Sequence, residues 1–376
     1  MIRARAYMTA VGLMVGAIWS HGQDSSAVSL RNELSSLIDS AVFQGLDSVR
    51  YKPGDAFAFL RSLRSGEGIY EQVSYDGIST LYDQEEDRIL AEDISRVRTS
   101  AQLRQLAMQF LPGTTAYDTL KEGLIRALAA DDKDKIRQLA PALNFYRWIH
   151  HHSFPRCIVV NIASATLCYF ERDTLRLRMK VVAGKPSTRT PRFAAWCDKV
   201  ILYPYWNIPR KIAVNEFLPM LKRLPALAET MNIQLLDSRG RIIDPTSVDW
   251  GRWNRDNFPY AMRQSTGCDN ALGVIKFNLT SPYDVYMHDT NLKAAFRSTS
   301  RYFSHGCIRL EKPFELGAAL LGDKLDTTFL AAGLKDQQPR PLYLEKPVPV
   351  FVVYLTADID ADGKLSFYRD IYHLLK

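Results

Sequence analysis

Residues 287–310 read MHDTNLKAAFRSTSRYFSHGCIRL and bring two histidines and one cysteine into a single short segment. The segment begins inside DVYMHDT (284–290), an apolar-polar pattern typical of a half-buried strand, and ends shortly after Ser304-His305-Gly306-Cys307. A cysteine in this setting can be a nucleophile, a metal ligand, one half of a disulfide or a small buried hydrophobe. The rest of the chain decides among these.

The N-terminus, MIRARAYMTAVGLMVGAIWSHGQDSS, has the build of a secretory signal. Arg3 and Arg5 precede an apolar run from Tyr7 to Trp19, which is too short to span a bilayer comfortably, and small and polar residues follow. We therefore expect a signal peptide over residues 1–22 and an exported protein. The alternative is an uncleaved anchor, which would make this segment the only membrane tether.

The cysteine count limits the roles that Cys307 can have. The chain has five cysteines, and an odd number in an exported protein leaves at least one thiol free. The other four are expected mainly as small buried hydrophobes, with one or two bridges among them left open: Cys157, Cys168, Cys197 and Cys268. Zinc is disfavoured because no Cys-x-x-Cys step completes a set with His288, His305 and Cys307. The role of nucleophile is therefore favoured for Cys307.

The formal net charge of +7 would suit an anionic partner. The basic residues are dispersed, however, and no basic stripe is interleaved with aromatic residues. We expect no nucleic-acid binding.

The patterning predicts an α+β protein. Residues 24–150 carry apolar residues three and four apart, which indicates an α-helical scaffold domain. Short strand patterns follow over 155–357 and predict a mainly antiparallel β-sandwich, interrupted by a mixed α/loop cap insertion at about 205–262. Residues 358–376 form a C-terminal hairpin and tail. The Asp362-Gly363 pair there favours a turn over a calcium loop, since Arg369 stands where a bidentate glutamate is needed.

A nucleophilic thiol needs a base and donors for the developing oxyanion. His288 lies on a predicted strand, and a neighbouring strand can return beside it to carry Cys307. Gly306 allows a positive φ or a close approach of backbone to substrate. These requirements point to acyl transfer through a cysteine.

The same segment resembles the signature of the L,D-transpeptidases with a YkuD-type catalytic domain. A histidine, about 15 residues and then Ser/Thr-His-Gly-Cys are found here at His288 and at 304–307. Further blocks over roughly 140–373 look like the larger, YcbB-like branch, including IVVNIA (158–163), YPYWNIP (203–209) and VPVFVVYLTADID (348–360). Arg309 after the signature is also like that branch. The branch's repeated peptidoglycan-binding motifs are absent from 24–140, and Ser265-Thr266-Gly267-Cys268 replaces a usual Pro-Gly loop.

The resemblance implies a role for each signature residue. Cys307 would be the nucleophile and His288 the general base. The backbone amides of His305, Gly306 and Cys307 would stabilise the oxyanion. Four residues are assigned to the substrate side of the site, with Tyr286 and Asp289 also orienting His288: Arg309, Ser304, Tyr286 and Asp289.

The resemblance also implies a reaction. A peptidoglycan stem tetrapeptide would acylate the cysteine with loss of D-alanine, and a diaminopimelate amine would take the acyl group to give a 3→3 cross-link, without cofactor or metal. Water or a protein acceptor would make the enzyme an L,D-carboxypeptidase or an attachment enzyme. A non-catalytic wall-binding scaffold is the alternative from another class. The expected location is the periplasm, at the cell wall or inner membrane.

Overall fold

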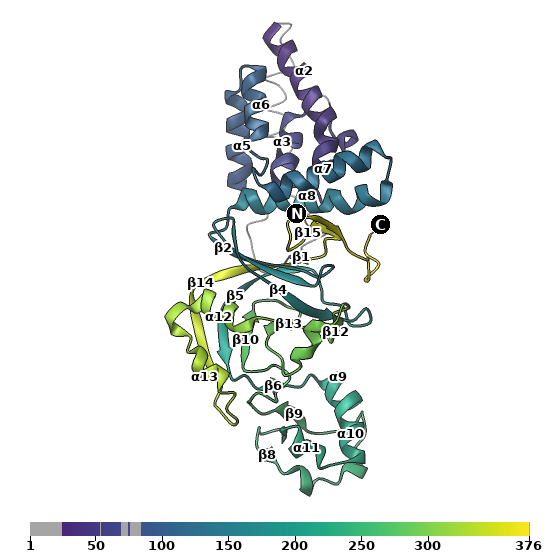
Figure 1. Ribbon diagram of the computed structural model, residues 1–376, viewed down its shortest axis with the longest axis vertical. Coiled ribbons are helices and arrows are strands. Elements are labelled where there is room, and N and C mark those ends of the chain that lie inside the picture. Colours follow the sequence, from purple (N-terminus) through teal and green to yellow (C-terminus); the bar gives the residue numbers. More distant parts are fainter. Residues whose placement is uncertain (1–24, 53, 69–73, 76–83, 376) are drawn as a thin grey trace.

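The computed structural model describes residues 25–52, 54–68, 74–75 and 84–375. The molecule is elongated, with helices at one end, a barrel in the middle and a smaller cap at the other end (Figure 1). The predicted signal peptide lies outside the described residues. Within the described ranges, no helix is long and apolar enough to cross a membrane.

The helical part contains six α-helices in the described ranges: α2 (Ser25–Ser40), α3 (Ala56–Ser65), α5 (Gln84–Arg96), α6 (Ser100–Met108), α7 (Thr115–Ala129) and α8 (Lys133–His152). Local capping sets several of their starts. Thr99 and Gln102 form a capping box at α6, and Asp132 accepts from the Lys135 amide at the start of α8. Leu34, Leu60 and Leu103 are fully buried where these helices meet.

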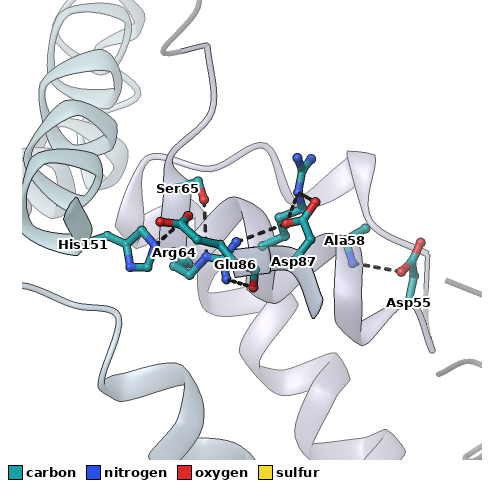
Figure 2. A network of polar contacts seen from close by, with 8 residues as sticks. Asp55, Ala58, Arg64, Ser65, Glu86, Asp87 and His151 are labelled. Carbon is teal, nitrogen blue, oxygen red and sulfur yellow. Dashed lines mark hydrogen bonds and ion pairs between the residues drawn. The ribbon is translucent and has the colours of Figure 1, made fainter. Parts of the chain in front are cut away.

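A polar network joins three of these helices (Figure 2). Arg64 of α3 is buried and donates to the Glu86 carbonyl oxygen at 2.9 Å and to the Asp87 carboxylate at 3.1 Å, both on α5. The Glu86 carboxylate in turn contacts His151 of α8 at 3.2 Å. Because α8 leads directly into the first strand of the barrel, the network fixes the helices against the element that connects to it.

Eight strands form the barrel: β2 (Arg156–Asn161), β3 (Thr166–Glu171), β4 (Thr174–Gly184), β5 (Phe193–Leu202), β10 (Ile275–Leu279), β11 (Met287–His288), β13 (Ile308–Leu310) and β14 (Arg340–Val353). They pair in the order β5-β10-β11-β13-β4-β3-β2-β14. Most neighbours are antiparallel, while β2–β14 and β11–β13 are parallel. Two short strands extend the sheet, because β1 (Ser74–Tyr75) pairs with β5 and β12 (Tyr302–Ser304) pairs with β4.

The predicted β-sandwich is wrong in one respect, because the sheet closes into a ring. β14 pairs with β2 on one side and with β5 on the other, so the two ends of the strand order meet. This 14-residue strand changes register between Tyr343 and Val348, and such irregularities bend a strand toward closure. The interior is filled by apolar side chains such as Ile158, Phe277 and Val350, and α12 (Pro313–Leu321) packs against the same cluster through Leu316.

The cap lies between β5 and β10 and has its own apolar core. A helical stretch runs through α9 (Arg210–Ile212), a π-helical turn (Ala213–Phe217) and α10 (Leu218–Arg223), followed by α11 (Leu227–Thr230). The sequence predicted only helix and loop here. The structure adds an antiparallel sheet of four short strands: β6 (Trp206–Asn207), β9 (Ala261–Gln264), β7 (Ile233–Leu236) and β8 (Ile242–Ile243).

The chain ends in a hairpin of β15 (Ala357–Ile359) and β16 (Leu365–Phe367) beside α7 and α8. The acidic groups that resemble a calcium loop are used internally. Asp358 is buried and accepts from Tyr146 at 2.8 Å and from Asn161 at 2.9 Å, while Asp360 accepts from the amides of Asp362 and Lys364. Gly363 takes the positive φ of 74° that the turn requires.

Candidate active site

The parallel pair β11–β13 determines which side chains share a face of the barrel. Met287 is opposite Ile308, and both are fully buried in the interior. Side chains alternate along a strand, so His288 and Arg309, the next pair, lie on the outer face. Tyr286 and Cys307 precede these pairs on the two strands. The Ile308 amide donates to the Tyr286 carbonyl oxygen at 3.1 Å. The parallel pairing therefore places the cysteine on the same face of the sheet as the histidine, opposite Tyr286 on the neighbouring strand.

His288 is buried, and its Nδ1 hydrogen-bonds to the backbone carbonyl oxygen of Asp289. A carbonyl only accepts, so Nδ1 carries the hydrogen and Nε2 is the nitrogen that can accept a proton. Burial, together with the positive charges of Arg309 and Lys276, lowers the pKa of His288 to about 3. The imidazole is therefore neutral at ordinary pH and can act as a base.

The Cys307 thiol is partly exposed and lies 3.9 Å from the carbonyl oxygen of Asp284. Burial raises the pKa of this thiol, while hydrogen bonds from Tyr286 and the charges of Lys276 and Arg309 act in the opposite direction. The resting pair is thus a neutral thiol and a neutral imidazole. A protonated thiol needs a base to form the thiolate, and His288 is the candidate base.

The loop that carries the cysteine is braced by hydroxyl groups. Ser304 donates to the Cys307 carbonyl oxygen at 2.6 Å and accepts from the Gly306 amide at 3.1 Å. Thr190 donates to the Gly306 carbonyl oxygen at 2.7 Å, and Gly306 has a φ of 123°. These bonds hold the loop in a backbone conformation that favours glycine.

The structure adds detail to two of the predicted roles, which stay predictions. The Gly306 amide donates to the Ser304 hydroxyl, and this hydroxyl also braces the loop through the Cys307 carbonyl oxygen. In the part of the chain that the structure describes, the amides of His305 and Cys307 have no hydrogen-bond partner. These two amides are free candidate donors for an oxyanion hole.

Asp289 also acts within the protein. Its carboxylate is buried, accepts from the Val274 amide at 3.1 Å and forms an ion pair with Lys293. Gly273 makes room for it, because a side chain there would place Cβ about 2.1 Å from Asp289 Oδ2. The carboxylate is thus used within the protein, while the backbone carbonyl oxygen of Asp289 orients His288; its place on the substrate side stays a prediction.

The cap reaches the site at two points. His305 Nε2 lies 2.8 Å from Glu216 Oε1 in the π-helical turn of the cap. The Tyr286 side chain lies near Trp206 of β6 and near Cys307, and both affect the pKa of its hydroxyl. Burial raises the pKa of Tyr286, so its hydroxyl stays protonated and can donate to the sulfur.

Sequence reasoning missed two residues of the site, Lys276 and Glu216. Lys276 of β10 is opposite His288 in the register, and its Nζ lies 3.8 Å from the centre of the Tyr286 ring. Only the register of β10 against β11 puts Lys276 in this site. No sequence signal pointed to Glu216, because its partner His305 is 89 residues away.

The remaining cysteines lie apart from this site. All five cysteines fall within the described residues and are unbridged. Cys157 and Cys197 are buried as expected, whereas Cys268 is exposed although Ser265 and Thr266 just before it are buried. Among the described residues, no group of three or more His, Cys, Asp and Glu side chains is placed to hold a metal ion.

A cavity of about 410 Å³ lies between the helical part and the barrel, and none of the predicted site residues lines it.

The arrangement described above, a thiol and a neutral imidazole on the outer face of a β-barrel, is that of a cysteine acyltransferase. Residues 155–323 match the family model described as the YkuD L,D-transpeptidase catalytic domain. A Haemophilus influenzae protein named "Putative L,D-transpeptidase" is 35% identical over 236 residues, which cover 61% of this chain. The chain spans about half, 47%, of that relative's length.

Two solved structures are also similar. An L,D-transpeptidase from Mycobacterium smegmatis is 14% identical, with a TM-score of 0.24, over 53% of this chain and 58% of that one. The catalytic domain of the Enterococcus faecium L,D-transpeptidase, acylated by ertapenem, is 13% identical, with a TM-score of 0.24, over 53% and 96% of the two chains. The family match and the curated relative agree, and both make residues 155–323 similar to YkuD L,D-transpeptidase catalytic domains.

Proposed function

We propose that the chain is a peptidoglycan L,D-transpeptidase that forms 3→3 cross-links through an acyl-enzyme on Cys307. The observation that supports this most is the pairing of β11 with β13, which places Cys307 on the same face of the sheet as His288, whose Nε2 is available as a base. The match of residues 155–323 to the L,D-transpeptidase family model supports the same reaction class.

The first half-reaction acylates the enzyme. His288 Nε2 takes the thiol proton as the sulfur attacks the donor carbonyl carbon, and the developing oxyanion faces the amides of His305 and Cys307. The tetrahedral intermediate collapses with cleavage of the amide bond. The imidazolium returns the proton to the amine of D-alanine, which leaves.

The second half-reaction uses the same groups in reverse. The acceptor amine of a diaminopimelate residue attacks the thioester, His288 takes the amine proton, and the thiol is restored when that proton returns to sulfur. Energy comes from the exchange of one amide bond for another, so no cofactor or nucleotide is needed. The cap, joined to the site through Glu216 and Trp206, is placed to exclude water from the thioester.

The proposal includes location and partners. The partners are stem peptides of the wall, a donor tetrapeptide and a diaminopimelate acceptor, and the proposed location is the periplasm. We propose that any membrane tether is the N-terminal segment. The assignment to the larger YcbB-like branch belongs to the same proposal.

The test uses purified protein without residues 1–22 and a carbapenem as the probe. A stoichiometric mass adduct is expected on the wild type and none on Cys307→Ala. An equal adduct on the alanine variant would overturn the assignment of the nucleophile. With a defined diaminopimelate tetrapeptide, 3→3 dimers indicate transpeptidation, tripeptide alone indicates the L,D-carboxypeptidase, and a peptide-linked protein indicates the attachment enzyme.

A further inference from the structure

Lys276 lies in a row of outward side chains that crosses the catalytic face. In the register, Lys276 of β10 is opposite His288 of β11, and His288 is opposite Arg309 of β13. Ile275 and Phe277, the neighbours of Lys276, are fully buried in the barrel, so the lysine side chain extends onto the outer face. The neutral imidazole therefore stands between two cationic side chains.

The ammonium of Lys276 has no protein anion to neutralise it. Among the described residues, no carboxylate lies within ion-pair distance of its Nζ. Its near contact is the face of Tyr286, at 3.8 Å from the ring centre. Burial lowers the pKa of Lys276, and the charge of Lys199 acts in the same direction, whereas Cys307 and Asp284 raise it. Asp284 thus attracts the ammonium from a distance without forming a pair.

Arg309, on the other side of the imidazole, is in a similar position. Burial lowers the pKa of its guanidinium, and the thiolate of Cys307, when it forms, acts in the opposite direction. Within the described part of the chain its side chain forms no ion pair and no hydrogen bond. A partly buried cation without a partner is costly, so proteins retain such groups mainly where an anion arrives from outside.

The thiolate is too short-lived to be that anion throughout the cycle. The thiol is protonated at rest, and the acyl-enzyme thioester carries no charge. The two cations would thus remain unpaired in both long-lived states of the enzyme. A charge that is present in both the Michaelis complex and the acyl-enzyme must belong to the acyl group itself.

We propose that Lys276 binds a carboxylate carried by the residue that acylates Cys307, and so selects a diaminopimelate-type donor over a lysine-type donor. The proposal rests on the proposed function. Diaminopimelate carries one side-chain carboxylate that lysine lacks. Lys276, whose ammonium lies over the face of the Tyr286 ring, would bind this carboxylate. Lys276 is then a specificity-determining residue on the donor side of the reaction.

The experiment measures acylation alone, so that the acceptor does not enter. Two synthetic tetrapeptides, identical except for meso-diaminopimelate or L-lysine at the third position, are mixed with enzyme, and formation of the acyl-enzyme is followed by intact mass. The measured quantity is the ratio of the two second-order acylation rates. The wild type is expected to prefer the diaminopimelate donor, and Lys276→Met is expected to reduce this preference about tenfold or more, as loss of one charge-assisted contact predicts.

Two further variants make the result decisive. Lys276→Arg keeps the charge and is expected to retain most of the preference, which a purely structural role of the lysine side chain would not predict. Lys324→Met removes an exposed lysine that is already paired with Glu345 at 3.0 Å, and should leave the ratio unchanged. Melting temperatures of all variants establish that they are folded.

The outcomes separate this proposal from the proposed function. If both donors acylate the wild type and Lys276→Met slows them by the same factor, the carboxylate assignment is wrong while the transpeptidase assignment stands. If the wild type is acylated by neither donor and by no carbapenem, the proposed function fails and this proposal with it. A preference of the wild type for the lysine donor would also overturn the proposal.

Discussion

The imidazole of His288 hydrogen-bonds through Nδ1 to the backbone carbonyl oxygen of Asp289, the next residue in the chain. A carbonyl fixes the tautomer without adding a charge, whereas a carboxylate partner would also favour the imidazolium. Burial and two nearby cations then keep the ring neutral. The base is thus oriented by backbone and kept available by its surroundings.

The first prediction concerns stability against pH. Because the pKa of His288 is about 3 in the folded protein and about 6.5 in an unfolded chain, the unfolded state binds more protons between these values. The contribution of His288 to stability is therefore complete above about pH 6.5 and is lost as the pH falls toward 3. Chemical unfolding of His288→Asn from pH 7 to pH 4 should show a shallower loss than the wild type, by up to about 1.4 kcal/mol per pH unit.

His373→Asn is the matched control for that experiment. His373 is exposed and has a φ of 51°, a conformation that asparagine tolerates well. It should keep the wild-type dependence on pH. A His288→Asn curve parallel to the wild type would show that His288 is protonated in the folded state.

The second prediction concerns the thiol. Tyr286 hydrogen-bonds to Cys307 through both its side chain and its backbone, and these bonds oppose the effect of burial on the thiol pKa. Tyr286→Phe removes only the hydroxyl, so the thiol pKa should rise and alkylation by iodoacetamide at a fixed pH should slow. The measurement is the pH profile of alkylation by mass spectrometry, in a Cys268→Ala background because Cys268 is exposed.

Tyr343→Phe provides the comparison, since Tyr343 is 63% exposed and the Lys199 ammonium lies over its ring near the start of β14. Its profile should match that of the Cys268→Ala parent. A Tyr286→Phe profile displaced toward lower pH would contradict the assigned contact.

The third prediction tests how tightly the base is supported. Gly273 has a φ of 60°, and a Cβ there would overlap the Asp289 carboxylate. Gly273→Ala should lower the free energy of unfolding by more than about 2 kcal/mol and slow acylation sharply, because movement of Asp289 also moves the carbonyl that orients His288. Gly240→Ala, with a φ of 76° and open space around it, should cost only about 1 kcal/mol and leave acylation unchanged. Equal effects of the two substitutions would mean that the contact with Asp289 does not matter.

The sequence predicts local features, such as single strands, better than it predicts closure of the barrel or the register between strands. Local patterns identified strands here: a β-branched run at 158–162 and alternation of apolar and polar residues at 175–182, which a half-buried strand imposes locally. Closure of the barrel could not be read in the same way, since it depends on β14 pairing with β5 more than 130 residues earlier. The cap sheet was missed because strands such as Trp206–Asn207 and Ile242–Ile243 are too short to show a period.

In the candidate site, too, the sequence predicts the local features and misses those that depend on tertiary contacts. His288 and Cys307 could be proposed together because their spacing matches a known signature, and the structure places them on adjacent strands. The use of Ser304 and Asp289 inside the protein depends on hydrogen bonds that residue type alone does not specify. Lys276 and Glu216 enter the site through tertiary pairing, which leaves no local pattern.

The last prediction concerns the contact between Glu216 and His305, which links the cap to the loop that carries the nucleophile. Both side chains are partly exposed, 51% and 38%, so water and salt weaken their attraction. Glu216→Ala should therefore slow donor acylation by no more than about fivefold, the equivalent of at most about 1 kcal/mol. The wild-type rate should fall toward that of the variant as salt is raised, because salt screens the contact that the variant lacks.

Two further variants serve as comparisons for Glu216→Ala. Glu216→Gln can still accept a hydrogen bond from His305, so its rate should lie between those of the wild type and the alanine variant. Glu229→Ala removes an exposed carboxylate elsewhere in the cap and should reproduce the wild-type rate and its dependence on salt. If Glu229→Ala and Glu216→Ala behave alike, the effect comes from the overall charge of the cap, and the link to His305 has no part in catalysis. If only Glu216→Ala is slow and insensitive to salt, cap closure is coupled to the catalytic loop through this one pair.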